Sequence, residues 1–231
     1  MVPADTERHL DNPIWWCLST RHAHFALGGP LARRYPAHIS PITGFPDTAA
    51  TVDALEALVP VGEDMGTFGP HVPALPSNWE ILKETRITQM IRRDSAPLPE
   101  GDAEVSALGK ADVADMLALV ELTQPGPFRR GTIELGRFVG IRESGRLMAM
   151  AGERMWVGDC REVSGICTHL DALGRGYARQ LSGRIVNGIL RAGQTPFLHV
   201  TSFNKRAIGI YEALGFARRT EFPLLHAKRV G

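Results

Sequence analysis

A glycine-rich turn in the last third of the chain has the residue types of an anion-binding site. The turn, Asp171-Ala-Leu-Gly-Arg-Gly176, lies between an apolar run, Glu162–Thr168, and a stretch whose apolar residues recur at helical spacing. The first N–H groups of a helix lack partners within the helix, and the helix dipole adds roughly half a positive charge there. Gly174 and Gly176 let the backbone approach a ligand closely. The order of strand, turn and helix therefore predicts a phosphate or pyrophosphate site, although a plain strand-to-helix turn would also favour these glycines.

The turn matches neither of two common phosphate-binding loops. A dinucleotide-binding fingerprint needs a third glycine where Arg179 stands. A triphosphate-binding loop needs Gly-Lys followed by Ser or Thr, and this turn has no such triplet. Gly-x-Gly before a helix therefore does not by itself distinguish a phosphate site from a plain strand-to-helix turn.

A second group of spaced residues follows the first. Asn204 suits the N-cap of a helix, because its side chain can accept a hydrogen bond from a free backbone N–H group. Ala207 and Tyr211 lie one turn apart on one face, and Gly215 suits the left-handed position after a helix end. This spacing predicts a helix over Asn204–Leu214.

The glycine-rich turn and the strand before it resemble motif A of the GNAT acetyltransferases. The matching residues are Val163-Ser-Gly-Ile-Cys-Thr-His169 and Leu173-Gly-Arg-Gly-Tyr-Ala178. Gly176 and Ala178 meet the family pattern Arg/Gln-x-x-Gly-x-Gly/Ala, while Leu173 stands at its first position. Leu170 replaces the proline that is usual after Thr-His. These departures concern side chains, whereas the family binds its cofactor at this loop mostly through backbone N–H groups.

The second group is similar to motif B of the same family. Its residues are Asn204-Lys-Arg-Ala207 and Tyr211-Glu-Ala-Leu-Gly215-Phe216. Together with Ala151-Gly-Glu153, the stretch from Pro196 to Phe216 resembles the FR47-like, glycine N-acyltransferase-like branch of the family. The resemblance covers about residues 104–227. It implies the GNAT fold, an α/β arrangement with a mixed, mostly antiparallel sheet flanked by helices.

The resemblance implies acetyl-coenzyme A as the co-substrate and assigns its contacts. Its pantetheine arm would lie along the strand that contains Ile166, with Asn204 nearby, and its pyrophosphate would lie at the turn before the helix. Arg175 and Arg179 are phosphate partners on this interpretation, although arginines on a first helical turn are often only solvated. The predicted cofactor-binding residues are Ile166, Cys167, Thr168, Leu173, Gly174, Arg175, Gly176, Tyr177, Ala178, Arg179, Asn204, Ala207 and Tyr211.

The implied reaction is direct attack of a primary amine on the thioester. An alkyl ammonium group has a pKa near ~10, so its proton must pass to a base or a water chain. Glu162 is the first choice for that base, because glycine N-acyltransferase relatives place a glutamate there; a salt bridge at a strand end is the alternative reading. Glu153 and His169 are the reserve candidates. Tyr211 would give a hydrogen bond to the departing thiolate, and a core role is its alternative.

The cysteines and the composition exclude several classes of protein. Cys17, Cys160 and Cys167 are three widely spaced residues, which suggests neither a disulfide framework nor a thiolate metal site. Cys167 lacks an activating histidine at fixed spacing, so a covalent acyl-enzyme is disfavoured. We expect no metal and no membrane span, and a reducing cytoplasm suits the chain best.

Charge is unevenly distributed along the chain. Residues 1–100 carry 8 Lys and Arg against 12 Asp and Glu, whereas residues 171–231 carry 10 against 3. The C-terminal excess is compatible with an anionic ligand, and equally with a solvated basic surface. It lacks interleaved aromatic residues, so nucleic acid is not an expected partner. The expected partner is a small-molecule amine, and the sequence leaves a homodimer open.

Periodicity predicts the elements that position these residues. We expect helices over Asp47–Val59, Asp112–Leu122, the segment from Ala178 to Arg191, and Asn204–Leu214. We expect strands over Glu104–Leu108, Arg137–Arg142, Arg146–Met155, Glu162–Thr168 and Pro196–Thr201, with one or two closing strands over Phe216–Ala227. Apolar bursts at Met65–Phe68 and Trp79–Arg92 have no predicted function.

The segment Asp94-Ser-Ala-Pro-Leu-Pro-Glu-Gly-Asp102 has the composition of a linker. It divides a smaller N-terminal α/β region, residues 1–100, from a predicted acetyltransferase domain, residues 101–231. The N-terminal region compares only loosely with a degenerate half of the GNAT fold. The sequence thus predicts an acyl-coenzyme A-dependent N-acyltransferase, and the alternative is a non-catalytic sensor or regulatory module that binds coenzyme A.

Overall fold

The computed structural model describes residues 4–46 and 52–231 of the protein. The α-helices are α1 (Ala4–His9), α2 (Pro13–Ser19), α3 (Val52–Leu58), α4 (Val113–Thr123), α5 (Tyr177–Arg191) and α6 (Lys205–Ala213). The strands are β1 (Leu27–Gly28), β2 (Arg33–Arg34), β3 (Thr43–Gly44), β4 (Asp64–Phe68), β5 (Trp79–Ile91), β6 (Ser106–Leu108), β7 (Phe138–Glu143), β8 (Arg146–Val157), β9 (Cys160–Thr168), β10 (Thr195–Thr201) and β11 (Ala217–Arg229). Short 3-10 turns are η1 (Lys110–Asp112), η2 (Thr132–Leu135) and η3 (Leu170–Ala172).

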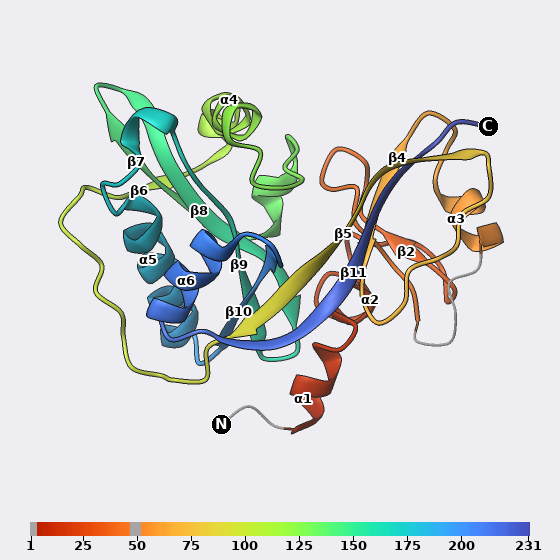
Figure 1. Ribbon diagram of the computed structural model, residues 1–231, viewed down its shortest axis with the longest axis horizontal. Helices are drawn as coiled ribbons and strands as arrows, with labels where there is room; N and C mark the ends of the chain where they lie inside the picture. The colour runs from red at the N-terminus through yellow and green to blue at the C-terminus, as the bar shows by residue number, and fades with distance from the viewer. Residues whose placement is uncertain (1–3, 47–51) are drawn as a thin grey trace.

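Eight strands form one sheet in the order β4-β11-β5-β10-β9-β8-β7-β6. Within it β9 and β10 are parallel, and every other neighbouring pair is antiparallel. The three two-residue strands β1, β2 and β3 form a separate small sheet. In Figure 1, α4, α5 and α6 accompany the strands of one half of the molecule, and α2 and α3 lie in the other half. The predicted α/β fold with a mixed, mostly antiparallel sheet is confirmed.

Helices α4 and α5 cover opposite faces of the sheet, because successive side chains of a strand point to opposite faces. On β8, Ala149 and Ala151 pack in one buried cluster with Leu181 of α5. Met150, which lies between them in sequence, packs in another cluster with Met116 of α4. The sheet is therefore buried on both sides at β8 and β9.

The N-terminal region contributes to the same sheet as the C-terminal region. Strand β5 pairs with β10 on one side and with β11 on the other, so two strands from the last third of the chain flank one from the first. Figure 1 shows β5 and β11 running together from one half of the molecule to the other. The predicted boundary at Asp94–Asp102 lies between β5 and β6, and one continuous sheet crosses it. Whether the two regions are separate domains stays a prediction.

The predicted linker is attached to α5 by side-chain hydrogen bonds. The Asn187 side-chain amide accepts a bond from the Leu98 N–H group at 2.7 Å and donates one to the Leu98 carbonyl at 2.8 Å. Gln180 makes the same pair of bonds with the backbone of Ala103, at 3.3 and 2.6 Å. An amide side chain thus completes the hydrogen bonding of an extended segment that has no strand partner at these residues.

Most predicted elements are confirmed to within about three residues, which is normal for element ends. The closing strands form one long strand, β11, with register shifts after Arg218 and His226. The helix predicted over Asp47–Val59 is α3, which begins at Val52; its predicted first residues, 47–51, lie outside the described part of the chain. Helices α1 and α2 and the small sheet were not predicted. In the described ranges no helix combines the length and apolar character that crossing a membrane requires.

Candidate active site

The parallel strands β9 and β10 separate from each other partway along the sheet. They pair only at Thr195 with Cys160, Pro196 with Arg161, and Phe197 with Glu162. Beyond Glu162, β9 continues beside β8 alone, and β10 continues beside β5. The backbone of β9 from Val163 to Thr168 therefore faces an opening. The predicted pantetheine residues Ile166, Cys167 and Thr168 all lie on this free edge.

A bulge interrupts β9 inside the opening. The register with β8 shifts by one residue between Ser164 and Cys167, and Gly165 between them has φ +62. A bulge bends its strand and redirects the neighbouring backbone groups, and the left-handed φ favours glycine. This feature was not predicted, although a glycine inside an apolar strand is a usual signal for a bulge.

Cys167 points away from the opening and into the core beneath α4. Its side chain packs in the cluster that contains Met116 and Met150. Burial raises the pKa of the Cys167 thiol to about 11, so the thiol is protonated at neutral pH. The geometry agrees with the expectation that Cys167 is not a nucleophile.

The glycine-rich turn presents free backbone N–H groups at the start of α5. Gly174 and Gly176 have φ +83 and +79, and beyond the adjacent residues no atom lies within 4 Å of the place where a Cβ would stand on either. The first hydrogen bond of the helix joins the Gln180 N–H group to the Gly176 carbonyl at 3.0 Å. The N–H groups of the three residues before Gln180 therefore lack partners within the helix. This open, donor-rich end has the chemistry that a pyrophosphate requires.

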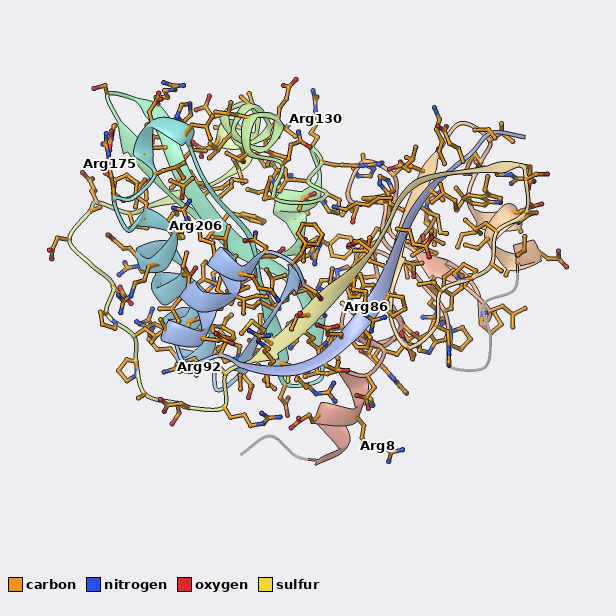
Figure 2. All side chains as sticks on the ribbon, viewed as in Figure 1. Arg8, Arg86, Arg92, Arg130, Arg175 and Arg206 are labelled. Carbon is orange, nitrogen blue, oxygen red and sulfur yellow. The ribbon has the colours of Figure 1, made fainter. Side chains whose placement is uncertain are left out.

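The two arginines of the turn differ in their partners. The Arg175 guanidinium donates to both oxygens of Glu143, at 2.7 and 2.8 Å, and the Tyr177 hydroxyl donates to the same carboxylate. Arg179 is exposed and forms no ion pair with any described residue. Leu173, at the first motif position, is also exposed. Arg179 is therefore the arginine available to a phosphate, and Figure 2 marks the place of Arg175.

Helix α6 has the two ends that its sequence predicts. The Asn204 side chain accepts a hydrogen bond from the Ala207 N–H group at 3.1 Å, which makes it the N-cap. At the other end Gly215 has φ +81, and its N–H group donates to the Glu212 carbonyl at 3.0 Å. The Phe216 N–H group donates to the Tyr211 carbonyl, also at 3.0 Å. This pair of bonds is the Schellman arrangement. Both caps are confirmed, and together they determine where the motif B residues lie.

Tyr211 lies on α6 with its ring partly buried. The ring packs against the α5 cluster and lies 6.2 Å from that of Phe216, centroid to centroid. Burial raises the pKa of the Tyr211 hydroxyl to about 12, so it keeps its proton at neutral pH. No described residue forms a hydrogen bond with this hydroxyl. It is therefore a protonated group whose hydrogen bond is available to a ligand.

Glu162 lies at the last paired position before β9 and β10 separate, and its side chain is only 1% exposed. Arg154 donates to its two oxygens at 2.8 and 2.7 Å, and the Met155 N–H group donates at 3.3 Å. His199 Nδ1 lies 2.8 Å from Oε1. Burial raises the pKa of this carboxyl, but the charge and hydrogen bonds of Arg154, with those of His199, lower it to about 2. Glu162 is thus an ionised carboxylate with four hydrogen-bond donors.

The reserve candidates for the base have other partners. Glu153 is buried between two arginines: Arg137 Nε and Arg161 Nε each donate to its carboxylate at 2.9 Å. The guanidinium of Arg137 also lies against Gly188 of α5. Glu153 therefore lies on the face that α5 covers. His169 is the N-cap of η3, and its Nδ1 accepts a bond from the Asp171 N–H group at 3.1 Å.

A cavity of about 410 Å³ lies between the two regions of the chain. Gln124, Phe128 and Arg129 line it from the loop after α4, while Asp64 and His226 line it from β4 and β11. Asp64 accepts a hydrogen bond from His226 Nε2 at 2.8 Å and another from Arg129. These bonds hold the pKa of Asp64 well below its usual range, so its charge is retained at neutral pH.

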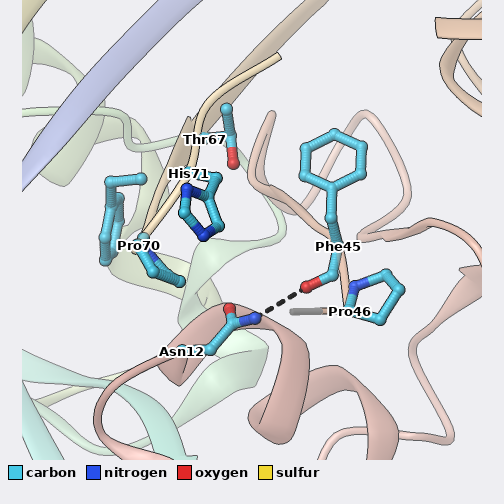
Figure 3. Close-up of a pocket in the computed structure, with 8 residues that line it drawn as sticks. Asn12, Phe45, Pro46, Thr67, Pro70 and His71 are labelled. Atoms are coloured by element: carbon cyan, nitrogen blue, oxygen red, sulfur yellow. Dashed lines mark hydrogen bonds between the residues drawn. The ribbon is translucent and has the colours of Figure 1, made fainter. Parts of the chain in front are cut away.

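A second pocket, shown in Figure 3, is much smaller. Its volume is about 10 Å³, which is room for about one water molecule. Asn12 donates to the Phe45 carbonyl across it at 2.8 Å, and Phe68 forms part of its wall. A pocket of this size cannot receive a substrate.

Comparisons with known proteins agree with this geometry. Residues 138–223 match the family model of the FR47-like proteins. The crystal structure of a Novosphingobium aromaticivorans protein, described as an acetyltransferase from the GNAT family, is 33% identical, with 95% of this chain and 98% of that chain covered and a TM-score of 0.85. A GCN5-related N-acetyltransferase from Kribbella flavida has the same fold at 16% identity, with 89% and 88% covered and a TM-score of 0.57. No curated protein matches the chain.

At that level of identity over nearly the whole of both chains, and with a matching domain model over the strands and helices that form the opening, the chain belongs to the GNAT family of acetyltransferases and contains an FR47-like domain.

Proposed function

We propose that the protein transfers an acetyl group from acetyl-coenzyme A to a primary amine of a small molecule. Acyl transfer is the chemistry of its family, and acetyl-coenzyme A and the amine are the proposed substrates. The observation that supports the proposal is the opening between β9 and β10, because the unpaired edge of β9 leads along the chain into the turn that ends at the donor-rich start of α5. A ligand with a pyrophosphate and an extended arm has partners for both parts there.

The residues of the chain fit such a ligand. The unpaired edge of β9 supplies N–H and carbonyl groups to the amides of a pantetheine arm. Gly174 and Gly176 leave space for a pyrophosphate against the first N–H groups of α5. The Tyr211 hydroxyl, with its raised pKa, keeps its proton and donates a hydrogen bond to the departing thiolate sulfur.

The cavity between the two regions is the proposed site for the acceptor. Gln124 and Phe128, from the loop after α4, form part of its lining. Val120 lines the cavity and also packs in one cluster with Cys167 of β9. The cavity therefore borders the same buried cluster as the strand that would carry the thioester, and direct attack requires the acceptor to reach that strand.

Glu162 stays the predicted base, and its surroundings limit how it can act. A carboxylate with four donors has no free lone pair directed at a substrate, so one bond must be released before a proton arrives. The bond from the Met155 N–H group is the longest of the four, at 3.3 Å. By distance it is the weakest of the four, so we propose that this bond is the one released.

The same observation favours a second candidate, a module that binds coenzyme A without catalysis. Such a module needs the pyrophosphate end and the free strand edge but no base. A carboxylate already bonded to Arg154 and His199 suits that role equally well.

One set of measurements separates the two candidates. Titration calorimetry with coenzyme A and acetyl-coenzyme A measures binding, and release of free thiol in the presence of a panel of amines measures transfer. We expect low-micromolar binding of both ligands and amine-dependent thiol release. Binding without turnover on any amine would favour the binding module. Absence of binding would overturn both candidates.

A further inference from the structure

A row of hydrogen-bonded polar side chains crosses five adjacent strands. The row consists of Arg154 on β8, Glu162 on β9, His199 on β10, Gln89 on β5 and Arg219 on β11. Arg154 and His199 both bond to Glu162, Gln89 Nε2 lies 3.1 Å from His199 Nε2, and Arg219 donates to Gln89 Oε1 at 3.0 Å. We call these five residues the polar row.

Gln89 determines which ring nitrogen of the neutral His199 carries the proton, because the nitrogen and the oxygen of the Gln89 amide each have another partner. Its nitrogen donates to the Leu10 carbonyl at 3.0 Å, and its oxygen accepts from Arg219, which can only donate. A flip of the amide, which would exchange its nitrogen and its oxygen, would therefore lose both bonds. Its second N–H bond is directed at His199 Nε2, which must then be the acceptor. The proton of a neutral His199 imidazole is consequently on Nδ1, which donates to Glu162.

The surroundings of His199 favour the neutral form, and in the described ranges only Glu162 and Gln89 form hydrogen bonds with the imidazole. The imidazole is 4% exposed, and its centroid lies 4.6 Å from that of Phe68, 5.7 Å from that of Phe197 and 6.2 Å from that of Phe222. A buried donor without an acceptor is costly in such apolar surroundings. The bond between His199 and Glu162 is therefore retained wherever the surrounding packing is retained.

This bond lies where the main-chain pairing of β9 and β10 ends. Phe197 with Glu162 is the last pair, and His199 is two residues further along β10, in the part that diverges from β9. The contact between His199 and Glu162 thus joins the two strands across the beginning of the opening. It is a side-chain bond at a point where the backbone has none.

We propose that His199 is a positioning residue that joins β10 to Glu162 of β9 and thereby determines the width of the opening for the pantetheine arm. The inference rests on the proposed function for its catalytic consequence, because the opening is the proposed cofactor site. The imidazole gains and loses no proton in this role. Its Nδ1–H group holds one oxygen of Glu162, and its Nε2 atom is held by Gln89.

Two variants separate the hydrogen bond from the packing. In His199→Asn the side-chain nitrogen can take the place of Nδ1 and still donate to Glu162. In His199→Phe the ring and its contacts with the three phenylalanines are kept, but both hydrogen bonds are lost. Hydrogen exchange of the cofactor-free protein, coenzyme A affinity and amine-dependent thiol release are measured for wild type and both variants.

We expect His199→Phe to speed exchange of the amides of residues 163–166 and 198–201 by roughly tenfold, as loss of one buried hydrogen bond predicts. Coenzyme A affinity should fall by a similar factor, and His199→Asn should restore both quantities to near the wild-type values. Exchange that rises evenly over the whole sheet would indicate a general loss of stability and overturn the proposal. An asparagine variant that binds coenzyme A normally but turns over as poorly as the phenylalanine variant would make His199 a proton carrier instead.

A measurement on the wild-type protein tests the same inference if a variant does not fold. Nitrogen NMR of the imidazole should show the proton on Nδ1 from about pH 5 to 8, without conversion to the cation. A proton on Nε2, or a titration near the ordinary histidine pKa, would contradict the arrangement. Exchange and tautomer need no cofactor, so a protein that fails to bind coenzyme A would refute the proposed function and leave the two tests of His199 decisive.

Discussion

The two ends of the proposed cofactor site are built differently. The pyrophosphate end, from Leu173 to Arg179, is an exposed turn whose donors are backbone N–H groups. The thioester end, around Glu162, is buried and depends on side chains from five strands, including β5 of the N-terminal region. The first end is local in sequence, and the second is assembled by the sheet. We therefore expect the first end to tolerate side-chain changes but not backbone changes, and the second end to show the opposite.

The largest effect is expected for Glu162→Gln at the buried end. Glutamine keeps the size of the side chain but leaves the Arg154 guanidinium without a counter-charge. Removal of one partner of a buried ion pair costs about 3–5 kcal/mol of unfolding free energy. Urea unfolding at pH 7 measures the loss.

The pH dependence of that loss has a defined sign. The pKa of the Glu162 carboxyl is about 2 in the folded protein and 4.5 ordinarily. The stabilisation of the folded protein by the ionised Glu162 carboxylate is therefore fully present above about pH 4.5 and is lost as the pH falls toward 2. The difference in unfolding free energy between wild type and Glu162→Gln should therefore become smaller as the pH is lowered from 5 to about 3. An equal difference at both pH values would mean that the charge of Glu162 does not stabilise the fold.

The same variant tests the predicted base. If Glu162 accepts the proton of the amine, Glu162→Gln depends on amine that solvent has already deprotonated, and that fraction rises tenfold per pH unit below the amine pKa. The deficit in kcat/KM should then shrink between about pH 6.5 and 9.5. A ratio that does not change with pH would direct attention to Glu153 or His169.

The next largest effect is expected for Gly176→Val at the pyrophosphate end. Valine strongly disfavours the left-handed φ of Gly176, so the turn must change and its N–H groups must move. Coenzyme A affinity should fall by roughly 100-fold or more, by calorimetry, because several charge-assisted bonds are lost together. Gly193→Val is the matched control, since Gly193 has φ +71 just after the other end of α5. Equal losses in both variants would show general strain and not a local site.

A smaller effect is expected for Tyr211→Phe, which removes one hydroxyl and keeps the ring. If the hydroxyl stabilises the departing thiolate, kcat should fall by roughly 100-fold while coenzyme A affinity is unchanged. The ring packing is retained, so the melting temperature should change little. An unchanged kcat, with the chemical step shown to limit the rate, would reduce Tyr211 to a core residue.

The smallest effect is expected for Arg179→Ala. An exposed arginine that meets a phosphate contributes about 1 kcal/mol, so the coenzyme A dissociation constant should rise by roughly fivefold and the effect should weaken with added salt. Arg184→Ala is the control, because Arg184 lies further along the same helix and pairs with Glu100. Equal losses in the two variants would mean that only general charge attraction is involved.

The sequence alone was sufficient for the C-terminal elements and for the backbone of the glycine-rich turn. Helix α6 illustrates why: Asn204 and Gly215 act through bonds to residues at most four positions away. The glycine-rich turn is equally local, since its donors are consecutive backbone groups. Where a structure depends on neighbours in sequence, residue type and spacing carry enough information to predict it.

The position of β5 and the neighbours of Glu162 were decided only by the tertiary structure. The sequence marks Trp79–Arg92 as apolar but does not state that it lies between β10 and β11, because strand pairing joins residues more than a hundred positions apart. It also indicates a glutamate at position 162, but the arginine and histidine that bond it are on two other strands. Local sequence determined the backbone of the proposed phosphate site. The sheet determined which charges and hydrogen bonds surround the predicted base, because those contacts exist only after distant strands have paired.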